Sequence, residues 1–319
     1  MIFARPPKPA IVGLLRTPRN TVDFADKLRA LLDDVRRHDS VLWRRAMRAG
    51  VLEGPDALVR YSPPLFGLLF GALLKNHRRA VRRNIRMARK GAGPLAEAAD
   101  VAQVFTNFAS CLTEAFLIAS ERGERLVARC VNHDLFERAA KKGAGVILAT
   151  AHTGGWQAAG PVLGSVYSAD VLMVMQRERD GRAQALQDDA RDRAGVRIAH
   201  VGDSPLDALP LLAHLRRGGV LAVQVDRVPR GMRGRDVELF GEPFRIPEGP
   251  LRLASLSSAP ILPVFTRRLG FMEYEVLLGE AIELPRKPSV EALDRAARHL
   301  ATEMERFVRA NPTQWFHFE

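Results

Sequence analysis

A histidine follows a short apolar segment in the middle of the chain. Residues Val146–Ala151 carry no charge and have glycines on both sides, which is typical of a buried parallel strand. His152 comes directly after this segment, so we expect its imidazole at the carboxyl end of a central strand, where open α/β sheets bind ligands. Histidine is the side chain best suited to act as a general base near neutral pH. The alternative is that His152 only satisfies a local backbone group.

An acidic residue takes the same place in a second apolar segment. Asp226 ends the segment Val220–Val225 just as His152 ends its own. Because the carboxyl ends of parallel strands meet at one edge of a sheet, we expect the two side chains to lie about 2.6–3.2 Å apart, within hydrogen-bonding distance. A carboxylate there would orient the imidazole and stabilise the imidazolium ion. The alternative is an aspartate that pairs with Arg227 or caps the loop.

The sequence around these residues resembles a known family. His152–Gln157, which reads HTGGWQ, is similar to the His-x4-acid block of the bacterial lipid A late acyltransferases, which belong to the lysophospholipid-acyltransferase-like superfamily. Other similar segments occur in the same order as in the family, and the resemblance extends over residues 75–319. These segments are Arg79–Ile85, Asp226–Arg227, Phe240–Ala254, Ala259–Phe265 and Asn311–Trp315.

The resemblance implies an O-acyltransferase. In that family a histidine removes the proton of an acceptor hydroxyl group, and the resulting nucleophile attacks an acyl thioester. The resemblance implies acyl-carrier protein or coenzyme A as the acyl donor and a lipid or glycolipid as the acceptor. It implies no metal ion and no cofactor, since the acyl thioester is a co-substrate.

One position of the histidine block departs from the family pattern. The family usually has a carboxylate where this chain has Gln157, and an amide cannot stabilise imidazolium by charge. We therefore expect Asp226 to supply the carboxylate. The alternative is a catalytically impaired relative that binds lipid.

Substrate-binding residues are expected at the same edge of the sheet. Gly154 and Gly155 permit close approach, so their backbone N–H groups could stabilise the oxyanion at the thioester carbonyl. The resemblance implies that one arginine after the second strand and another near the following helix hold acidic groups of the donor or acceptor, and Arg177 and Arg193 fit these places. The alternative for each arginine is an ordinary surface position. The candidate substrate-binding residues are Gln157, Arg177, Arg193, Arg227, Gly154 and Gly155.

The segments that must position these residues alternate between strand and helix. This alternation predicts an α/β fold, with a mostly parallel central sheet flanked by helices on both faces. We expect an N-terminal helical region that faces the membrane, residues 1–142, followed by the acyltransferase core, residues 143–319. Expected strands are 146–151, 171–175, 196–201, 220–225, 261–266 and 274–278, and expected helices include 21–37, 94–120, 133–142, 154–167, 181–194, 205–217, 250–258 and 290–310.

An apolar segment stands directly before a basic one in the N-terminal region. Leu65–Leu74 is nearly all apolar, and Lys75–Lys90 is rich in arginine, which fits an element that lies on an anionic membrane surface. The alternative is a core helix followed by a solvated basic helix, but the resemblance favours the membrane. The longest apolar segment, Pro63–Leu74, is too short to span a bilayer, and no signal peptide is visible. We therefore expect a peripheral protein on the cytoplasmic face of the inner membrane.

The overall composition favours an anionic partner. The 319 residues include 48 basic and 36 acidic side chains, a formal net charge of +12, which suits a membrane surface, nucleic acid or an acidic carrier. The basic segments contain few aromatic residues and no nucleic-acid motif, so nucleic-acid binding is the weaker alternative. The sequence lacks the G-x-S-x-G motif of serine hydrolases, the P-loop and the dinucleotide fingerprint. We expect Cys111 and Cys130 to be reduced and buried.

Overall fold

The structure is a computed structural model that describes residues 41–118, 120–156, 169–177, 197–202 and 204–319. The chain divides into two compact units, residues 1–44 and 45–319, and the elements considered below belong to the second. The first described helix, α2 (Val41–Glu53), begins in the last residues of the first unit. The helices expected over 21–37 and 181–194, and most of that expected over 154–167, lie outside the described residues.

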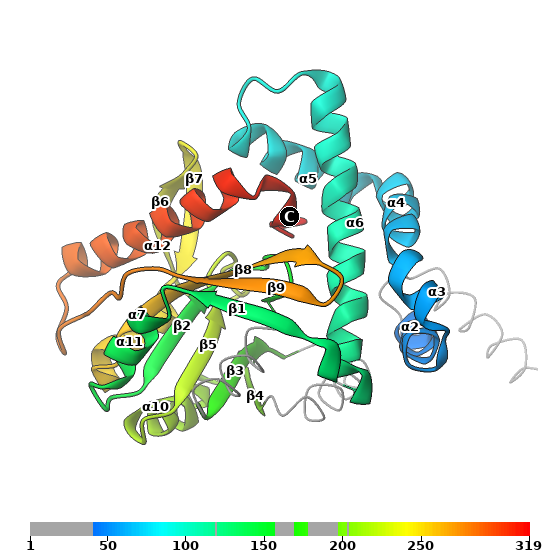
Figure 1. The fold of residues 1–319 in the computed structure, drawn as a ribbon. Coiled ribbons are helices and arrows are strands. Elements are labelled where there is room, and N and C mark those ends of the chain that lie inside the picture. The colour runs from blue at the N-terminus through cyan, green and yellow to red at the C-terminus, as the bar shows by residue number, and fades with distance from the viewer. Residues whose placement is uncertain (1–40, 119, 157–168, 178–196, 203) are drawn as a thin grey trace, which may run out of the picture. The chain divides into compact units, whose positions relative to one another are not determined.

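The described residues form a seven-stranded, mostly parallel sheet with the strand order β1-β9-β8-β2-β5-β3-β4 (Figure 1). The β8–β9 pair is antiparallel, and every other neighbouring pair in this sheet is parallel. The predicted fold class is therefore confirmed. The strands are β1 (Val127–Val131), β2 (Val146–Thr150), β3 (Val171–Gln176), β4 (Arg197–Val201), β5 (Val220–Gln224), β8 (Ile261–Gly270) and β9 (Glu273–Leu278).

Two strands differ from the sequence expectation. The edge strand β1 was not predicted, because its residues are only partly buried and show no continuous apolar pattern. It pairs with β9, so the first strand of the sheet lies before the expected boundary at residue 142. Strand β8 runs four residues beyond the expected end at Thr266, because its polar end pairs with β9, where Arg267 lies opposite Glu275.

Helices pack on both faces of the sheet, and strand β2 is buried between them. On one face, Ile147 and Ala149 of β2 pack with apolar residues of α10 (Ala208–Arg216), α11 (Glu248–Ser257) and α12 (Val290–Ala310). On the other face, Leu148 packs with residues of α7 (His133–Ala140). Burial on both faces explains why the sequence of β2 is continuously apolar rather than alternating.

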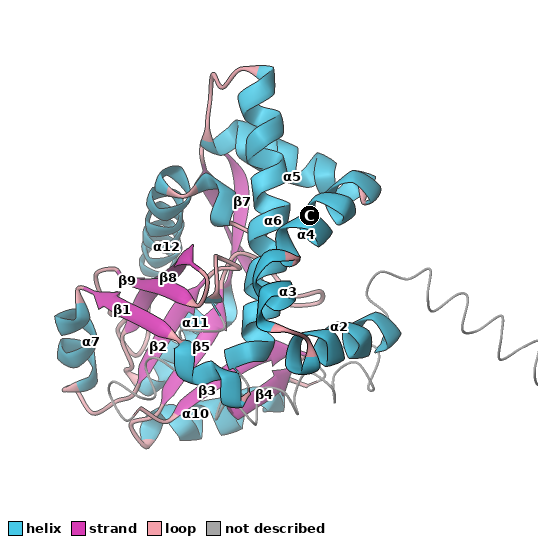
Figure 2. Ribbon diagram, turned by 45° about the vertical axis from the view of Figure 1, so that its right-hand side comes forward, coloured by secondary structure: helices cyan, strands magenta, loops and turns pink. Residues whose placement is uncertain are grey.

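Three helices pack against one another beside the sheet: α4 (Pro63–Leu73), α5 (Lys75–Ala88) and α6 (Pro94–Ile118) (Figure 2). By length and composition, α6 is the described helix that could span a membrane, and half of its apolar window is buried inside the protein. A short helix, α3 (Asp56–Tyr61), precedes α4.

Helix α4 buries its small residues and exposes its large ones. Gly67 and Gly71 face α6, and a Cβ atom at Gly71 would lie 2.9 Å from the ring of Phe105. Leu65 and Leu73 are each 67% exposed on the outside of the same helix. A core helix would do the reverse, so the apolar sequence of this segment is explained by an outward-facing surface.

A two-stranded hairpin stands apart from the main sheet and packs on α12 (Figure 1). It consists of β6 (Gly234–Leu239) and β7 (Glu242–Pro247), joined by Phe240 and Gly241. Both turn residues have positive φ values, +59° and +82°, as a type I′ turn requires, and Phe240 is nevertheless buried. The hairpin thereby brings aromatic side chains to the carboxyl edge of the main sheet.

Candidate active site

His152 and Asp226 follow two neighbouring strands in the middle of the sheet. Strands β2 and β5 are in register, with Thr150 opposite Gln224. His152 comes two residues after Thr150, and Asp226 comes two residues after Gln224. The two residues therefore lie side by side at the same edge of the sheet. The arrangement expected from the two apolar segments is present.

The two side chains form a close hydrogen-bonded pair. Nδ1 of His152 lies 2.9 Å from Oδ1 of Asp226, and the backbone N–H of His152 donates to Oδ2 at 3.1 Å. The Asp226 side chain is fully buried, whereas the imidazole keeps 23% of its surface exposed. Since a carboxylate only accepts hydrogen bonds, Nδ1 carries the proton and Nε2 is left as the basic nitrogen. The pair therefore presents one open proton acceptor backed by a buried negative charge.

The environment keeps the Asp226 carboxyl ionised. Burial by itself would raise the pKa of Asp226, but the charge of His152, the hydrogen bond from its ring and the charge of His317 lower it, and the net result is a pKa below the ordinary value of 3.8. A negative charge is thus available at this position across the physiological pH range.

The last residues of the chain complete the surroundings of the pair. We call residues 312–319 the C-terminal strap. The indole Nε1 of Trp315 donates to Oδ2 of Asp226 at 3.1 Å, and the backbone N–H of Phe316 donates to the carbonyl oxygen of His152 at 2.7 Å. The sequence motif around Trp315 was noticed only as part of the resemblance. Its contact with Asp226 joins positions 89 residues apart and has no signal in sequence spacing.

The two glycines after His152 are packed against other parts of the protein. A Cβ atom at Gly154 would lie 2.0 Å from the side-chain oxygen of Gln314, and one at Gly155 would lie 1.9 Å from the ring of Tyr274. The backbone N–H of Gly155 also contributes to the environment of the buried Cys111 thiol, whose pKa is raised to about 12 mainly by burial. Close packing is a sufficient reason for glycine at both positions, and their oxyanion role stays a prediction.

The other predicted substrate-binding residues lie in different parts of the structure, and two of them are not described. Arg177 is exposed just after β3, on the same edge of the sheet as His152. Among the described residues, Arg227 contacts Glu319 and the carbonyl oxygen of Phe316, both in the strap. Gln157 and Arg193 lie outside the described residues. The expected alternative of an Asp226–Arg227 pair is therefore replaced by a contact between Arg227 and the strap.

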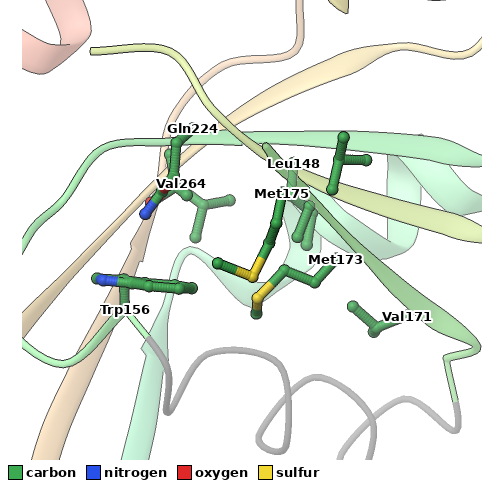
Figure 3. Close-up of a pocket in the computed structure, with 10 residues that line it drawn as sticks. Leu148, Trp156, Val171, Met173, Met175, Gln224 and Val264 are labelled. Carbon is green, nitrogen blue, oxygen red and sulfur yellow. The ribbon is translucent and has the colours of Figure 1, made fainter. Parts of the chain in front are cut away.

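A narrow apolar pocket begins beside the histidine and extends along one face of the sheet (Figure 3). Trp156 and Gln224 lie at one end of it, Val171 lies at the other, and Met173 and Met175 lie between them. The ring centroids of Trp156 and His152 are 6.2 Å apart, which places the first end close to the catalytic candidate. The cavity left between the lining side chains is about 20 Å³. The Nε2 atom of Gln224 is buried and has no hydrogen-bond partner among the residues that the structure describes.

A buried ionic network connects α6 to strands β8 and β9 next to the turn that follows His152. Glu114 of α6 is 1% exposed and accepts hydrogen bonds from Arg268 Nε at 2.8 Å, from the backbone N–H of Met272 at 3.1 Å and from the hydroxyl group of Tyr274. Tyr274 in turn supports Gly155. Sequence reasoning missed this network, because a single glutamate in an apolar helix gives no sign of its partners.

Both cysteines are free, and Cys111 is buried as predicted, but the prediction that Cys130 is buried is wrong, because this residue of the edge strand β1 is only half-buried. The raised pKa of Cys111 keeps it protonated at neutral pH, so it is not an activated nucleophile.

Two comparisons with known proteins fit this geometry. The chain is 26% identical over 187 residues to the phosphatidylinositol mannoside acyltransferases of Mycobacterium tuberculosis strains H37Rv and CDC 1551. That match covers 57% of this chain and 56% of each relative, so the chain matches just over half the length of these relatives. The profile of the family described as bacterial lipid A biosynthesis acyltransferase matches residues 49–319, which include the whole sheet and the C-terminal strap. The chain therefore belongs to the bacterial lipid A biosynthesis acyltransferase family.

Proposed function

We propose that this protein is a membrane-associated O-acyltransferase, which moves a fatty acyl group from an acyl thioester to a hydroxyl group of a lipid or glycolipid. The donor is acyl-carrier protein or coenzyme A. The observation that carries the proposal is the His152–Asp226 pair, in which Asp226 engages Nδ1 and the partly exposed imidazole leaves Nε2 as the nitrogen that accepts a proton. The relatives named for acyl transfer to a glycolipid support the same class of acceptor.

The reaction needs one base and no covalent enzyme intermediate. Nε2 of His152 accepts the proton of the acceptor hydroxyl as its oxygen bonds to the thioester carbonyl carbon. The tetrahedral intermediate then collapses, the C–S bond breaks, and the leaving thiolate takes the proton from the imidazolium ion. Asp226 stabilises that imidazolium through the 2.9 Å contact at Nδ1. In this scheme the thioester is a co-substrate, and neither a metal ion nor a further cofactor takes part.

The apolar pocket suits the acyl chain of the donor. It begins beside Trp156 and is lined by aliphatic and methionine side chains along the sheet. A hydrocarbon chain needs more room than the 20 Å³ left in this structure, so Met173 and Met175 must change rotamer to admit it. Methionine is flexible enough to do so. With the chain in this pocket, the carbonyl group lies at the end that holds the amide of Gln224, which has no partner in the described part of the chain and can donate to the developing oxyanion.

The outward face of α4 suits a membrane surface. Leu65, Leu69 and Leu73 expose 67%, 52% and 67% of their surfaces, and α5 follows with exposed arginines such as Arg79 and Arg83. Apolar residues that enter the lipid beside cations that meet anionic headgroups would hold the protein at the leaflet that carries its acceptor. For an enzyme that uses an intracellular acyl donor, this leaflet is the cytoplasmic face of the inner membrane.

An acyl-transfer assay tests the proposal. Purified protein is given acyl-carrier protein or coenzyme A that carries a radiolabelled acyl group, together with vesicles of extracted bacterial lipid, and the lipids are analysed by mass spectrometry. We expect an acylated lipid with wild type and none with His152→Ala, while His299→Ala on α12 keeps full activity. Lipid binding without transfer by wild type would instead favour the catalytically impaired relative, in which Gln157 has cost the chain its activity.

A further inference from the structure

The carboxylate of Asp226 is held by donors from two distant parts of the chain. Its Oδ1 atom faces Nδ1 of His152. Its Oδ2 atom accepts from the backbone N–H of His152 and from the indole of Trp315, each at 3.1 Å. The two contacts on Oδ2 fix the plane of the carboxyl group, which leaves Oδ1 aimed at the ring. Two of these three contacts come from His152 itself, so the indole is the contact that ties the orientation of the carboxyl group to the C-terminal part of the chain.

Trp315 is itself rigidly held. It is 3% exposed, and its ring stacks on His317 with centroids 5.0 Å apart. Rings of Phe240 and Phe244 from the hairpin contact it, each at 6.5 Å. A bridge between Thr153 and Trp315 joins the backbone of the strap to the residue after His152. The indole N–H therefore cannot turn away from Asp226 without disturbing several packed groups.

The rest of the strap is fastened on both sides. Towards the sheet, the amide of Gln314 accepts from the backbone N–H of Arg268 at 2.7 Å and donates to its carbonyl oxygen at 2.8 Å. Towards the helices, Asn84 of α5 donates to the carbonyl oxygen of His317 at 2.6 Å, and Asn107 of α6 donates to that of Thr313 at 3.0 Å. The strap is thus a fixed platform for the indole.

We propose that Trp315 is a positioning residue of the acyl-transfer site, which acts on His152 by orienting the Asp226 carboxylate and drawing charge from its Oδ2 atom. This inference rests on the proposed function. Loss of the indole N–H should lower kcat roughly 10- to 100-fold, because the carboxylate then holds the imidazole at another angle, with Nε2 turned from the acceptor hydroxyl, although the two groups stay paired. The KM for the acyl donor should not change, because Trp315 is not in the pocket.

The electrostatic part of the role has a distinct signature. Without the indole N–H, more of the negative charge of Asp226 is available to stabilise the imidazolium ion of His152. The acid limb of the pH–rate profile should then move to higher pH, by roughly half a unit to one unit. The other charged or titratable groups near the pair are His317 and Glu319 in the strap and Arg227, which contacts the strap. Replacement of Trp315 leaves all three in the protein. A merely structural role would lower activity without moving the profile.

The test compares two replacements of Trp315 with a control in the strap packing. Trp315→Phe removes the donor and part of the ring, and site-specific incorporation of benzothienylalanine replaces the indole N–H by sulfur and keeps the ring shape. The control is Phe108→Leu on α6, whose ring contacts Phe316 and Phe318 of the strap but not Asp226. For each protein, the pH dependence of kcat and KM is measured beside the NMR titration of the His152 ring and the melting temperature.

We expect both Trp315 replacements to shift the acid limb and the His152 titration upward, whereas Phe108→Leu lowers only the melting temperature. The inference is overturned if the benzothienylalanine protein keeps the wild-type profile and titration, whatever its stability. The NMR titration decides the matter even if wild type transfers no acyl group. In that case the proposed function fails separately from the role of Trp315.

Discussion

His152 and Asp226 are 74 residues apart in the sequence, yet Nδ1 of one lies 2.9 Å from Oδ1 of the other. The carboxylate that orients this imidazole therefore comes from the neighbouring strand and not from the position five residues after the histidine. Gln157 occupies that position, and its amide cannot take over the charge.

This relationship predicts that Asp226→Asn costs far more activity than Gln157→Ala. Loss of the orienting carboxylate in a known triad lowers kcat by about 10⁴, so a loss of at least about 100-fold is expected here. Initial rates of thioester release measure both variants. Gln157→Glu is the informative companion, because it restores the family's usual acid and should be tolerated or should partly rescue Asp226→Asn. The prediction is contradicted if Asp226→Asn has no effect, the wild-type protein is inactive and only the Gln157→Glu variant transfers acyl groups. Asp226 would then not be the functional acid.

Much of this arrangement followed from the sequence because strand order in parallel sheets has simple consequences. Two apolar segments that end in titratable residues predicted the His152–Asp226 contact, since neighbouring parallel strands place their carboxyl ends together. The same reasoning had no means of placing Trp315 or Glu114. Their partners, Asp226 and Arg268, are 89 and 154 residues away, and both contacts depend on how the strap and α6 pack against the sheet.

Most strands of the core were predicted with nearly correct ends, whereas the polar end of β8 and the whole of β1 were missed. Strand β2 is buried on both faces and therefore has a continuous apolar sequence, but β1 is an edge strand that includes Arg129. Arg129 pairs with Glu275 of β9 at 2.7 Å, an interaction that periodicity does not reveal. Edge strands are hard to predict from sequence, because they are more exposed to solvent and lack a continuous apolar pattern.

The half-buried imidazole of His317 predicts a pH dependence of stability. Burial lowers the pKa of His317 below its ordinary value of 6.5, and Arg227 adds to this effect while Asp226 opposes it. Because the unfolded chain binds the proton more tightly, the stabilising contribution is present above pH 6.5 and is lost as the pH falls through the lowered folded-state pKa. His317→Phe keeps a ring beside Trp315 and should flatten this dependence. Urea unfolding between pH 5 and 8 measures both proteins, and equal slopes below pH 6.5 would contradict the prediction.

The inverted packing of α4 predicts where the protein meets lipid. Replacing Leu65, Leu69 and Leu73 by serine should weaken binding to anionic vesicles strongly, because burial of a leucine in an apolar phase is worth about 1.5–3 kcal/mol. Leu256→Ser on α11 is the matched control, since that leucine is also 51% exposed but lies on another helix. Vesicle flotation at low and high salt measures the binding. A triple variant that floats as well as the control would place the contact elsewhere, and tight salt-sensitive binding to duplex DNA would revive the nucleic-acid alternative.

The close packing of Gly155 predicts that a larger residue at this position destabilises the protein. Gly155 has a φ of +71°, and a Cβ atom there would lie 1.9 Å from Cε1 of Tyr274, whose ring is buried and tied to Glu114. Gly155→Ala therefore combines backbone strain of about 1–2 kcal/mol with overpacking of about 1–3 kcal/mol. A fall in melting temperature of roughly 3–8 °C is expected for a chain of this length. Gly249→Ala is the control, because a Cβ atom at this position of α11 would meet nothing within 4 Å and alanine favours a helix. If the two variants have the same melting temperature, the Tyr274 ring moves aside for the added methyl group. Its packing against the turn after His152 then contributes less stability than the short distance indicates.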